Sequence, residues 1–381
     1  MESYLSALSK EEHTTLHLSA LYEKSGYKKY RNTRFEEYSF YHDFQGFLAG
    51  EGVITFNNAD GRLMALKPDM TLSILKNVEI SPRSFSRIYY NENVYRFQKS
   101  TRAYKEIHQC GLEIIGPLDA VATGEVVLLA LQSLSGMDED YVLTLSHADL
   151  VAQALEAQPV PAQTKERMAV CMQKKNLHDL QFFGEQAELA PARIRALQQL
   201  ADTSAPLDEA ADCLLALAAD LFDTKEARAP YEHAVHELQV LDFMFRDTEY
   251  AAHLLLDTSV INPVDYYSGI VMQGYIRPVP QLVLAGGRYD RLAHKLRKDV
   301  GAMGFAVYLD RLSAYYKKSR ASEADTLLLY EEDTPPQLLM QKRRELQQKG
   351  HRVRVEKEMP ANRKAGLCLR YADGNWEECH V

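Results

Sequence analysis

The stretch Tyr95–Gly116, YRFQKSTRAYKEIHQCGLEIIG, decides how this chain is interpreted, because it places polar side chains inside an otherwise strand-like pattern. Gln109, Gly111 and Glu113 share one parity, so on a strand their side chains point to the same face of a sheet. Burying an amide and a carboxylate on a face that opens onto a core is costly unless both find partners. The stretch therefore predicts either an internal hydrogen-bonded network or a polar ligand at this face.

The composition is that of an ordinary globular protein, with 46% hydrophobic and 25% charged residues, and 381 residues suffice for two or three domains. The formal net charge of -9 gives no basic footprint of the kind that nucleic-acid binders have. Residues 1–10 do not read as a signal peptide, and no apolar run reaches the roughly 18 residues of a membrane span. The five cysteines are too widely spaced for a zinc site or a disulfide framework. We therefore expect a cytoplasmic protein that binds neither membranes nor metals.

The residues around the opening stretch predict a mixed α+β core. Two short strand-like runs flank an Asn-Asn-Ala-Asp-Gly turn and predict a hairpin, and Pro68 followed by Asp69 marks the start of a helix. The predicted elements of this part are strands at 54–56 and 63–66, a helix at 69–77, strands at 89–97 and 107–115 joined by a polar turn at 98–104, and a helix at 119–133.

From residue 148 to 245 the pattern changes to apolar residues at helical spacing, which predicts a helical insertion at about 150–245. Beyond it we predict strands at 254–257, 265–275 and 282–285, a turn at Gly286–Gly287, a helix at 289–296, and a glycine-containing entry into a helix at 301–316. A polar linker at 317–323 precedes a small α/β unit with strands at 326–330, 352–356 and 366–371 and a helix at 336–349. This organisation predicts two domains, 1–320 and 324–381.

Six segments in this order resemble the catalytic core of histidyl-tRNA synthetase, a class II aminoacyl-tRNA synthetase, over residues 16–316 apart from the insertion. They are the hairpin, LKPDMT at 66–71, the opening stretch as class II motif 2, DYYSGIV at 265–271, AGGRYDRL at 285–292, and GFAVYLDRL at 304–312 as motif 3. Any one of them is a weak signal, whereas six in order are specific. The resemblance implies an antiparallel sheet core with helices.

The resemblance also implies a histidine pocket. Carboxylates can accept hydrogen bonds from the ammonium and the imidazole N–H, an amide can bridge, and tyrosines supply flat walls with hydroxyl tips. The positions that match the family's pocket are Asp69, Thr71, Arg96, Gln109, Glu113, Tyr266 and Tyr267.

The ATP half of the resembled site differs from the family's pattern. Gln98 replaces an acidic residue of motif 2, and Asn262 replaces an arginine that balances charge during adenylate formation. An asparagine cannot stabilise a developing phosphoryl charge. In motif 3, Arg311 is kept, but Asp310 replaces the family's glutamate, and Tyr308 replaces a small glycine and would partly fill the adenine slot. We therefore expect little or no adenylation.

The C-terminal unit is shorter than the anticodon-binding domain of such synthetases, so we expect no tRNA binding. The combination resembles the synthetase paralogues that serve as regulatory subunits of ATP phosphoribosyltransferase, the first enzyme of histidine biosynthesis. That resemblance implies no catalysis, no cofactor, self-association, and assembly with the short-form catalytic subunit into a hetero-octamer. It also implies that the chain raises the activity of the catalytic subunit and transmits feedback inhibition by L-histidine.

Several alternatives stay open at this point. The whole chain could be an active histidyl-tRNA synthetase or a stand-alone histidine sensor. Instead of binding a ligand, Arg96 could form an ion pair with Glu113 or with Asp265. Because neighbours on a strand alternate between faces, one of Tyr266 and Tyr267 could instead belong to the core, and Tyr267 is the preferred pocket member.

Overall fold

The structure is a computed structural model. It describes residues 8–44, 47–48, 52–79, 81, 83–98, 101–260, 266–318, 324–332, 334–359, 365–372 and 374–379. Two positions singled out above, Asn262 and Asp265, lie outside these ranges. The chain divides into two compact units, Glu12–Leu312 and a smaller one that contains Ser313–Val381. The division into domains at 1–320 and 324–381 stays a prediction.

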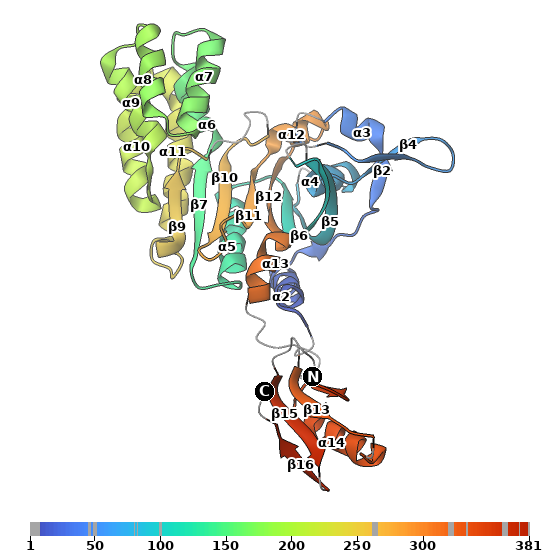
Figure 1. Cartoon of the computed structure of the whole chain (residues 1–381). Helices are drawn as coiled ribbons and strands as arrows, with labels where there is room; N and C mark the ends of the chain where they lie inside the picture. The colour runs from blue at the N-terminus through green and yellow to red at the C-terminus, as the bar shows by residue number, and fades with distance from the viewer. Residues whose placement is uncertain are drawn as a thin grey trace. The chain divides into compact units, whose positions relative to one another are not determined.

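The larger unit is built on a nine-stranded, mainly antiparallel sheet in the described part of the chain (Figure 1). The pairs β1–β5 and β7–β9 are parallel, and the other pairs are antiparallel. In spatial order the strands are β1 (Lys28–Lys29), β5 (Ser86–Gln98), β6 (Ala103–Gly116), β12 (Gly301–Tyr308), β11 (Leu284–Arg288), β10 (Ile270–Ile276), β7 (Tyr141–His147), β9 (Leu254–Asp257) and β8 (Ser204–Pro206).

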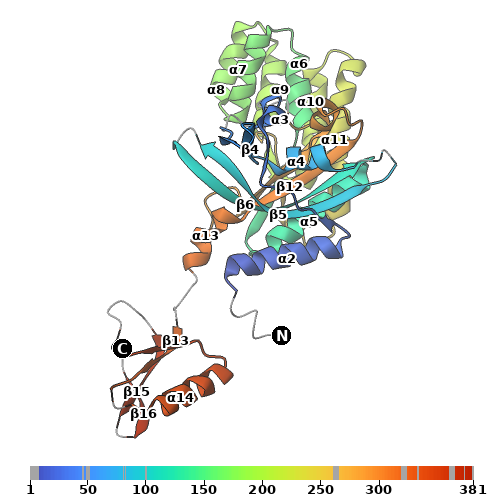
Figure 2. The same ribbon diagram turned by 90° about the vertical axis from the view of Figure 1, so that its right-hand side faces the viewer.

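Helices cover both faces of this sheet (Figure 2). On one face lie α2 (Lys10–Lys24) and α5 (Ala120–Ser135), where the Tyr22 ring contacts Tyr89 and Phe305. On the other face, α4 (Met70–Asn77) and α12 (Asp290–Lys295) pack with Ile88 and Ile115 into one core cluster. Because side chains alternate along β6, Gln109 and Glu113 point toward this second face, as their parity predicts.

A second, three-stranded sheet precedes α4. It consists of β2 (Phe35–Glu37), β4 (Leu63–Leu66) and β3 (Thr55–Asn57), and the short helix α3 (Tyr38–His42) follows β2. The β3–β4 pair is the predicted hairpin. After β4, the Lys67 carbonyl accepts a 2.9 Å hydrogen bond from the Tyr95 N–H, which holds the start of α4 against β5.

Residues 148–245 are mainly helical, as their spacing predicts. We call α6 to α11 the helical segment, and Figure 1 shows it beside β7 and β9 at one end of the sheet. Its helices are α6 (Ala148–Glu156), α7 (Ala162–Gln173), α8 (Leu177–Gln186), α9 (Pro191–Asp202), α10 (Leu207–Leu221) and α11 (Lys225–Phe245), and the 3-10 turn η2 (Ala251–His253) follows.

Three predictions of secondary structure are wrong. The strand predicted from residue 265 begins only at Ile270, because 266–269 form a turn and bends. Gly286–Gly287 lie inside β11 rather than in a turn, and a Cβ at Gly286 would lie 2.2 Å from the Gly304 carbonyl oxygen. Close strand packing, not turn geometry, requires this glycine. Residues 301–308 form strand β12 before α13 (Leu309–Lys318), so the predicted helix entry is itself a strand.

The smaller unit contains a four-stranded sheet among the described residues, with the predicted helix on it. Leu328 of the central strand packs with Leu339 and Leu346 of that helix. The elements are β14 (Val353–Glu356), β13 (Ala324–Leu329), β15 (Ala365–Ala372) and β16 (Asn375–Glu378) in spatial order, and α14 (Pro336–Gln348). The sequence did not predict β16. Within the described ranges, no helix combines the length and the apolar character needed to cross a membrane.

Candidate functional site

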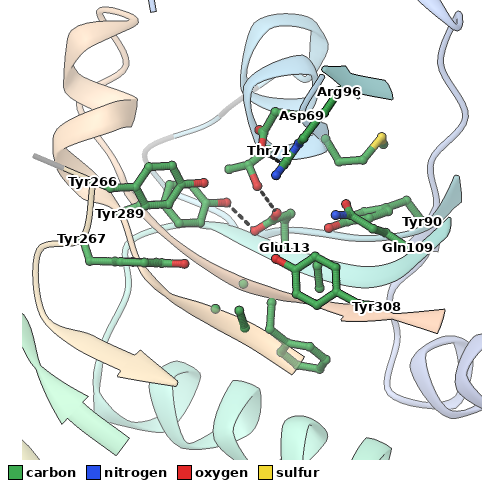
Figure 3. A pocket seen from close by; sticks show the side chains of 16 residues that line it. Asp69, Thr71, Tyr90, Arg96, Gln109, Glu113, Tyr266, Tyr267, Tyr289 and Tyr308 are labelled. Carbon is green, nitrogen blue, oxygen red and sulfur yellow. Dashed lines mark hydrogen bonds and ion pairs between the residues drawn. The ribbon is translucent and has the colours of Figure 1, made fainter. Parts of the chain in front are cut away.

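A polar cavity of about 60 Å³ lies at the sheet face that α4 and α12 cover (Figure 3). A single buried water needs about 10–15 Å³ on a comparable measure, so the cavity has room for a small polar group. Its polar and aromatic lining comes from both sheet strands and flanking helices: Asp69, Thr71, Tyr90, Arg96, Gln109, Glu113, Tyr266, Tyr267, Tyr289 and Tyr308.

Small residues form the floor of the cavity where β6, β12 and β11 run side by side. Ala306 is paired with Gly111 on one side and with Ala285 on the other. Gly304 is paired with Glu113, and a Cβ at Gly304 would lie 1.8 Å from Glu113 Oε2. Because only hydrogen fits there, the glycine leaves the space that the carboxyl group occupies.

Glu113 is the most deeply buried acid of the site, at 2% exposure. Thr71 donates a 2.8 Å hydrogen bond to its Oε1, and the Tyr289 hydroxyl donates a 2.5 Å bond to its Oε2 (Figure 3). Burial raises the pKa of Glu113 to about 8, although both hydroxyl donors favour the charged form and the nearby Asp69 charge disfavours it. At neutral pH this carboxyl group is therefore mostly protonated.

Asp69 and Arg96 form the rim of the cavity opposite the floor. One Asp69 oxygen caps α4 by accepting a 2.8 Å bond from a backbone N–H of its first turn, and the other lies 3.7 Å from Arg96 Nη2. Arg96 Nε also donates a 2.8 Å bond to the Pro68 carbonyl. The suggested partner Glu113 is instead held by hydroxyl groups, and Asp265 lies outside the described residues. The Asp69 carboxylate is thus fixed where it could bind an ammonium group that enters the cavity.

Three tyrosines form one wall. The ring centroids of Tyr266 and Tyr267 are 4.6 Å apart, and those of Tyr266 and Tyr289 are 6.4 Å apart. Burial raises the pKa of all three hydroxyls well above the usual value of 10.0, so they remain neutral hydrogen-bond groups. Both Tyr266 and Tyr267 line the cavity, because 266–269 form a turn and bends in which strand alternation does not apply.

The opposite end of the cavity is formed by Gln109 and Tyr308, which are register partners on β6 and β12. The Arg311 guanidinium lies over the Tyr308 ring, 4.0 Å from its centroid, and donates a 2.5 Å hydrogen bond to the Leu282 carbonyl. The ring and the guanidinium thus already contact each other, and the arginine has a backbone partner as well.

The structure brings together all seven residues that the sequence offered for a histidine pocket: Asp69, Thr71, Arg96, Gln109, Glu113, Tyr266 and Tyr267. Their role as histidine ligands stays a prediction. Gln98 lies at the end of β5, where it accepts a 3.0 Å bond from Thr101. Asn262 lies outside the described residues.

Among the tyrosines of the lining, sequence reasoning missed Tyr90 and Tyr289. Tyr289 stands directly after the Gly-Gly-Arg of the AGGRYDRL segment, so its place in that segment was an available signal. Tyr90 is opposite Gly111 in the β5–β6 register, and a Cβ at Gly111 would lie 2.6 Å from the Tyr90 hydroxyl oxygen. That relation needs the strand register, which the sequence alone does not state.

Known proteins similar to this chain carry consistent names. An "ATP phosphoribosyltransferase regulatory subunit" from Moorella thermoacetica is 29% identical over 352 residues, which are 89% of this chain and 86% of that protein. Further relatives have the same name, at 23–26% identity.

Solved structures share the fold. An "ATP phosphoribosyltransferase regulatory subunit/histidyl-tRNA synthetase" from Bacillus halodurans gives a TM-score of 0.71 at 22% identity, covering 91% of this chain and 88% of that one. A chain of the "ATP phosphoribosyl transferase (HisG:HisZ) complex" from Thermotoga maritima gives a TM-score of 0.58 at 17% identity, covering 78% and 97%.

The family model described as histidyl-tRNA synthetase matches residues 2–312. This range holds the whole nine-stranded sheet and every residue of the cavity. The match and the shared fold confirm the α+β, class II synthetase-like architecture that the sequence predicts. The chain belongs to the histidyl-tRNA synthetase family.

Proposed function

We propose that this chain is a non-catalytic regulatory subunit of ATP phosphoribosyltransferase that binds L-histidine in the cavity at the sheet face. The names of its relatives support the regulatory assignment, since the Moorella thermoacetica protein is similar over most of both chains. The finer claims concern the ligand, the lack of catalysis and the response to histidine. These rest on the chemistry of the cavity.

The observation that carries the proposal is the pairing of two acids in one small cavity. Asp69 is held at the rim by α4, and Glu113 is buried and held by Thr71 and Tyr289. Histidine offers two matching groups, its α-ammonium group and its imidazole ring. We assign the ammonium to Asp69 and the imidazole to Glu113, over the flat floor that Ala306 and Gly304 leave open.

The proposed loss of adenylation rests on the other end of the cavity. Tyr308 lies beside Gln109, and Arg311 is already stacked on Tyr308 and bonded to the Leu282 carbonyl. An arginine that has these contacts must leave them before it can hold a flat nucleotide base. Asn262 also lacks the positive charge that a phosphoryl-transfer transition state requires.

We further propose that the chain assembles with the short-form catalytic subunit in the cytoplasm, raises its activity and makes it sensitive to histidine. Histidine can inhibit only if it binds the inhibited and the active assembly with different affinity. Self-association, the hetero-octamer and the absence of tRNA binding belong to the same proposal.

Two measurements on the purified chain test the proposal. Isothermal titration calorimetry should detect L-histidine binding, while L-alanine, which has the ammonium and the carboxylate but no imidazole, should give no comparable heat. Histidine-dependent ATP–pyrophosphate exchange should be absent. Robust exchange would identify an active synthetase instead, and the failure of both amino acids to bind would remove the ligand assignment. A failure to bind a short-form catalytic subunit, with histidine binding intact, would favour a stand-alone sensor.

A further inference from the structure

A polar network connects the tyrosine wall of the cavity to the helical segment. We infer that Glu237 of α11 is a positioning residue for histidine binding, because it holds Arg288 and through it the turn that carries Tyr266 and Tyr267. Binding in the cavity should therefore also order the helical segment. The inference deepens the proposed function and rests on it.

The turn 266–269 packs against Arg288 at the end of strand β11 and is hydrogen-bonded to it. The Ser268 N–H donates a 2.9 Å bond to the Arg288 carbonyl, and the Asp290 N–H donates a 2.9 Å bond to the Ser268 hydroxyl. A Cβ at Gly269 would lie 3.1 Å from Arg288 Cδ, so the turn packs directly on the arginine side chain. A shift of Arg288 therefore moves the turn together with its two tyrosines.

The Arg288 side chain is bound at two places. Its Nε donates a 2.8 Å bond to Asp290, and its Nη1 lies 3.8 Å from Glu237 Oε1. The second Glu237 oxygen accepts a 2.8 Å bond from His147 Nε2. His147 Nδ1 in turn accepts the Asp149 N–H at 3.2 Å, so a neutral His147 carries its proton on Nε2, facing Glu237. Arg288 and His147 thus bind the two oxygens of one carboxylate.

Burial does not neutralise that carboxylate. The hydrogen bond from His147, together with the positive charge of Arg288, keeps the pKa of Glu237 below its usual value despite desolvation. Charge-assisted hydrogen bonds are stronger and more directional than neutral ones. The His147 bond therefore fixes a charged Glu237 opposite Arg288, and the charge pair favours one position of the arginine.

A second contact joins the same turn to the other end of the helical segment. The Ala148 N–H, at the first residue of α6, donates a 2.8 Å bond to the Gly269 carbonyl. Helix α6 thus contacts the turn directly through a backbone hydrogen bond, whereas α11 reaches it through the Glu237–Arg288 ion pair. A ligand that immobilises Tyr266 and Tyr267 should reduce the motion of both helices. By reciprocity, a change that loosens these helices should weaken binding in the cavity.

The test compares Glu237→Gln with Glu232→Gln. The glutamine in place of Glu237 can still accept the His147 N–H but loses the charge that faces Arg288. Glu232 lies on the same helix and is paired with Arg228 at 3.9 Å, so it serves as a matched control. Histidine affinity measured by calorimetry should fall about twofold to thirtyfold in Glu237→Gln, the range of typical coupling energies, and stay unchanged in Glu232→Gln.

Hydrogen–deuterium exchange supplies a readout that a merely structural role would not change. Saturating histidine should slow exchange in α11 and in the first turn of α6 of the wild type, and in Glu237→Gln the effect should be lost in α11 but kept in α6. In a double-mutant cycle, Glu237→Gln combined with Arg288→Met should weaken binding no more than the stronger single change. Additive losses, or unchanged affinity in Glu237→Gln, would overturn the inference while histidine binding itself stands. A wild type that binds no histidine would remove the proposed function as well.

Discussion

The Tyr289 hydroxyl lies 2.5 Å from Glu113 Oε2, which joins two residues that are 176 positions apart in the sequence. Glu113 lies on β6, and Tyr289 immediately precedes α12. The contact gives a buried acid one of its two hydroxyl donors, and it ties the tyrosine wall to the sheet. The properties of the cavity therefore depend on this pair.

Replacing Tyr289 by phenylalanine should weaken histidine binding and raise the pKa of Glu113 further. The hydroxyl favours the charged carboxylate, so its loss stabilises the protonated form. We expect about a tenfold to hundredfold loss of affinity, which corresponds to one charge-assisted hydrogen bond. Calorimetry checks the affinity, and an NMR titration of the Glu113 carboxyl carbon checks the pKa. Tyr231→Phe, which removes a buried hydroxyl bonded to the Leu214 carbonyl in the helical segment, should leave both unchanged.

Glu113→Gln should change how the stability of the ligand-free protein depends on pH. The pKa of Glu113 is about 8 in the folded state and near the ordinary 4.5 in the unfolded chain, so folding takes up a proton between these values. The wild type should therefore lose stability as the pH rises from 5 to 8, by about 2–4 kcal/mol from this group. Glutamine has no such dependence and can keep both hydroxyl contacts. Thermal unfolding at pH 5 and pH 8 measures the difference, and parallel pH profiles for the two proteins would contradict it.

Asp69→Asn and Asp69→Ala should separate the two roles of Asp69. Asparagine can still cap α4, whereas alanine loses the cap at a cost of about 1 kcal/mol of stability. Both variants lose the negative charge, so histidine affinity should fall about tenfold to hundredfold in each. Denaturant unfolding and calorimetry together check this. Unchanged affinity in Asp69→Asn would show that the carboxylate does not meet the ligand's ammonium.

Gly304→Ala, a substitution at a buried position, should abolish histidine binding. The added methyl group would lie 1.8 Å from Glu113 Oε2 and 2.3 Å from the Leu112 carbonyl oxygen, so the carboxyl group must leave its place. Calorimetry on the folded variant, with folding checked by circular dichroism, tests this expectation. Wild-type affinity would mean that the ligand does not use Glu113.

The sequence predicted those parts of the site that depend on local pattern. The parity of Gln109 and Glu113 placed both on one sheet face, and Asp69 after Pro68 marked the start of α4. These signals act within one strand or one helix turn, so they survive in the fold. The resemblance to synthetases supplied the relation between segments that are far apart in the chain.

The sequence failed where tertiary packing decides the backbone. Gly286–Gly287 have the composition of a turn, yet the close approach of β12 keeps them in a strand. The assumption of a strand left room for only one of Tyr266 and Tyr267 in the pocket, whereas the bends at 266–269 bring both tyrosines to the cavity. The contact of Tyr289 with Glu113 requires the position of α12 over β6, which no local pattern encodes.

The most direct test of the central claim is a histidine titration of ATP phosphoribosyltransferase activity in the complex of a short-form catalytic subunit with this chain. Wild type and Glu113→Gln should raise the activity of the catalytic subunit equally. Histidine should inhibit the wild-type complex, and the half-inhibitory concentration should rise about tenfold or more with Glu113→Gln. Equal inhibition of the two complexes, or no effect of the chain on the catalytic subunit, would contradict the account.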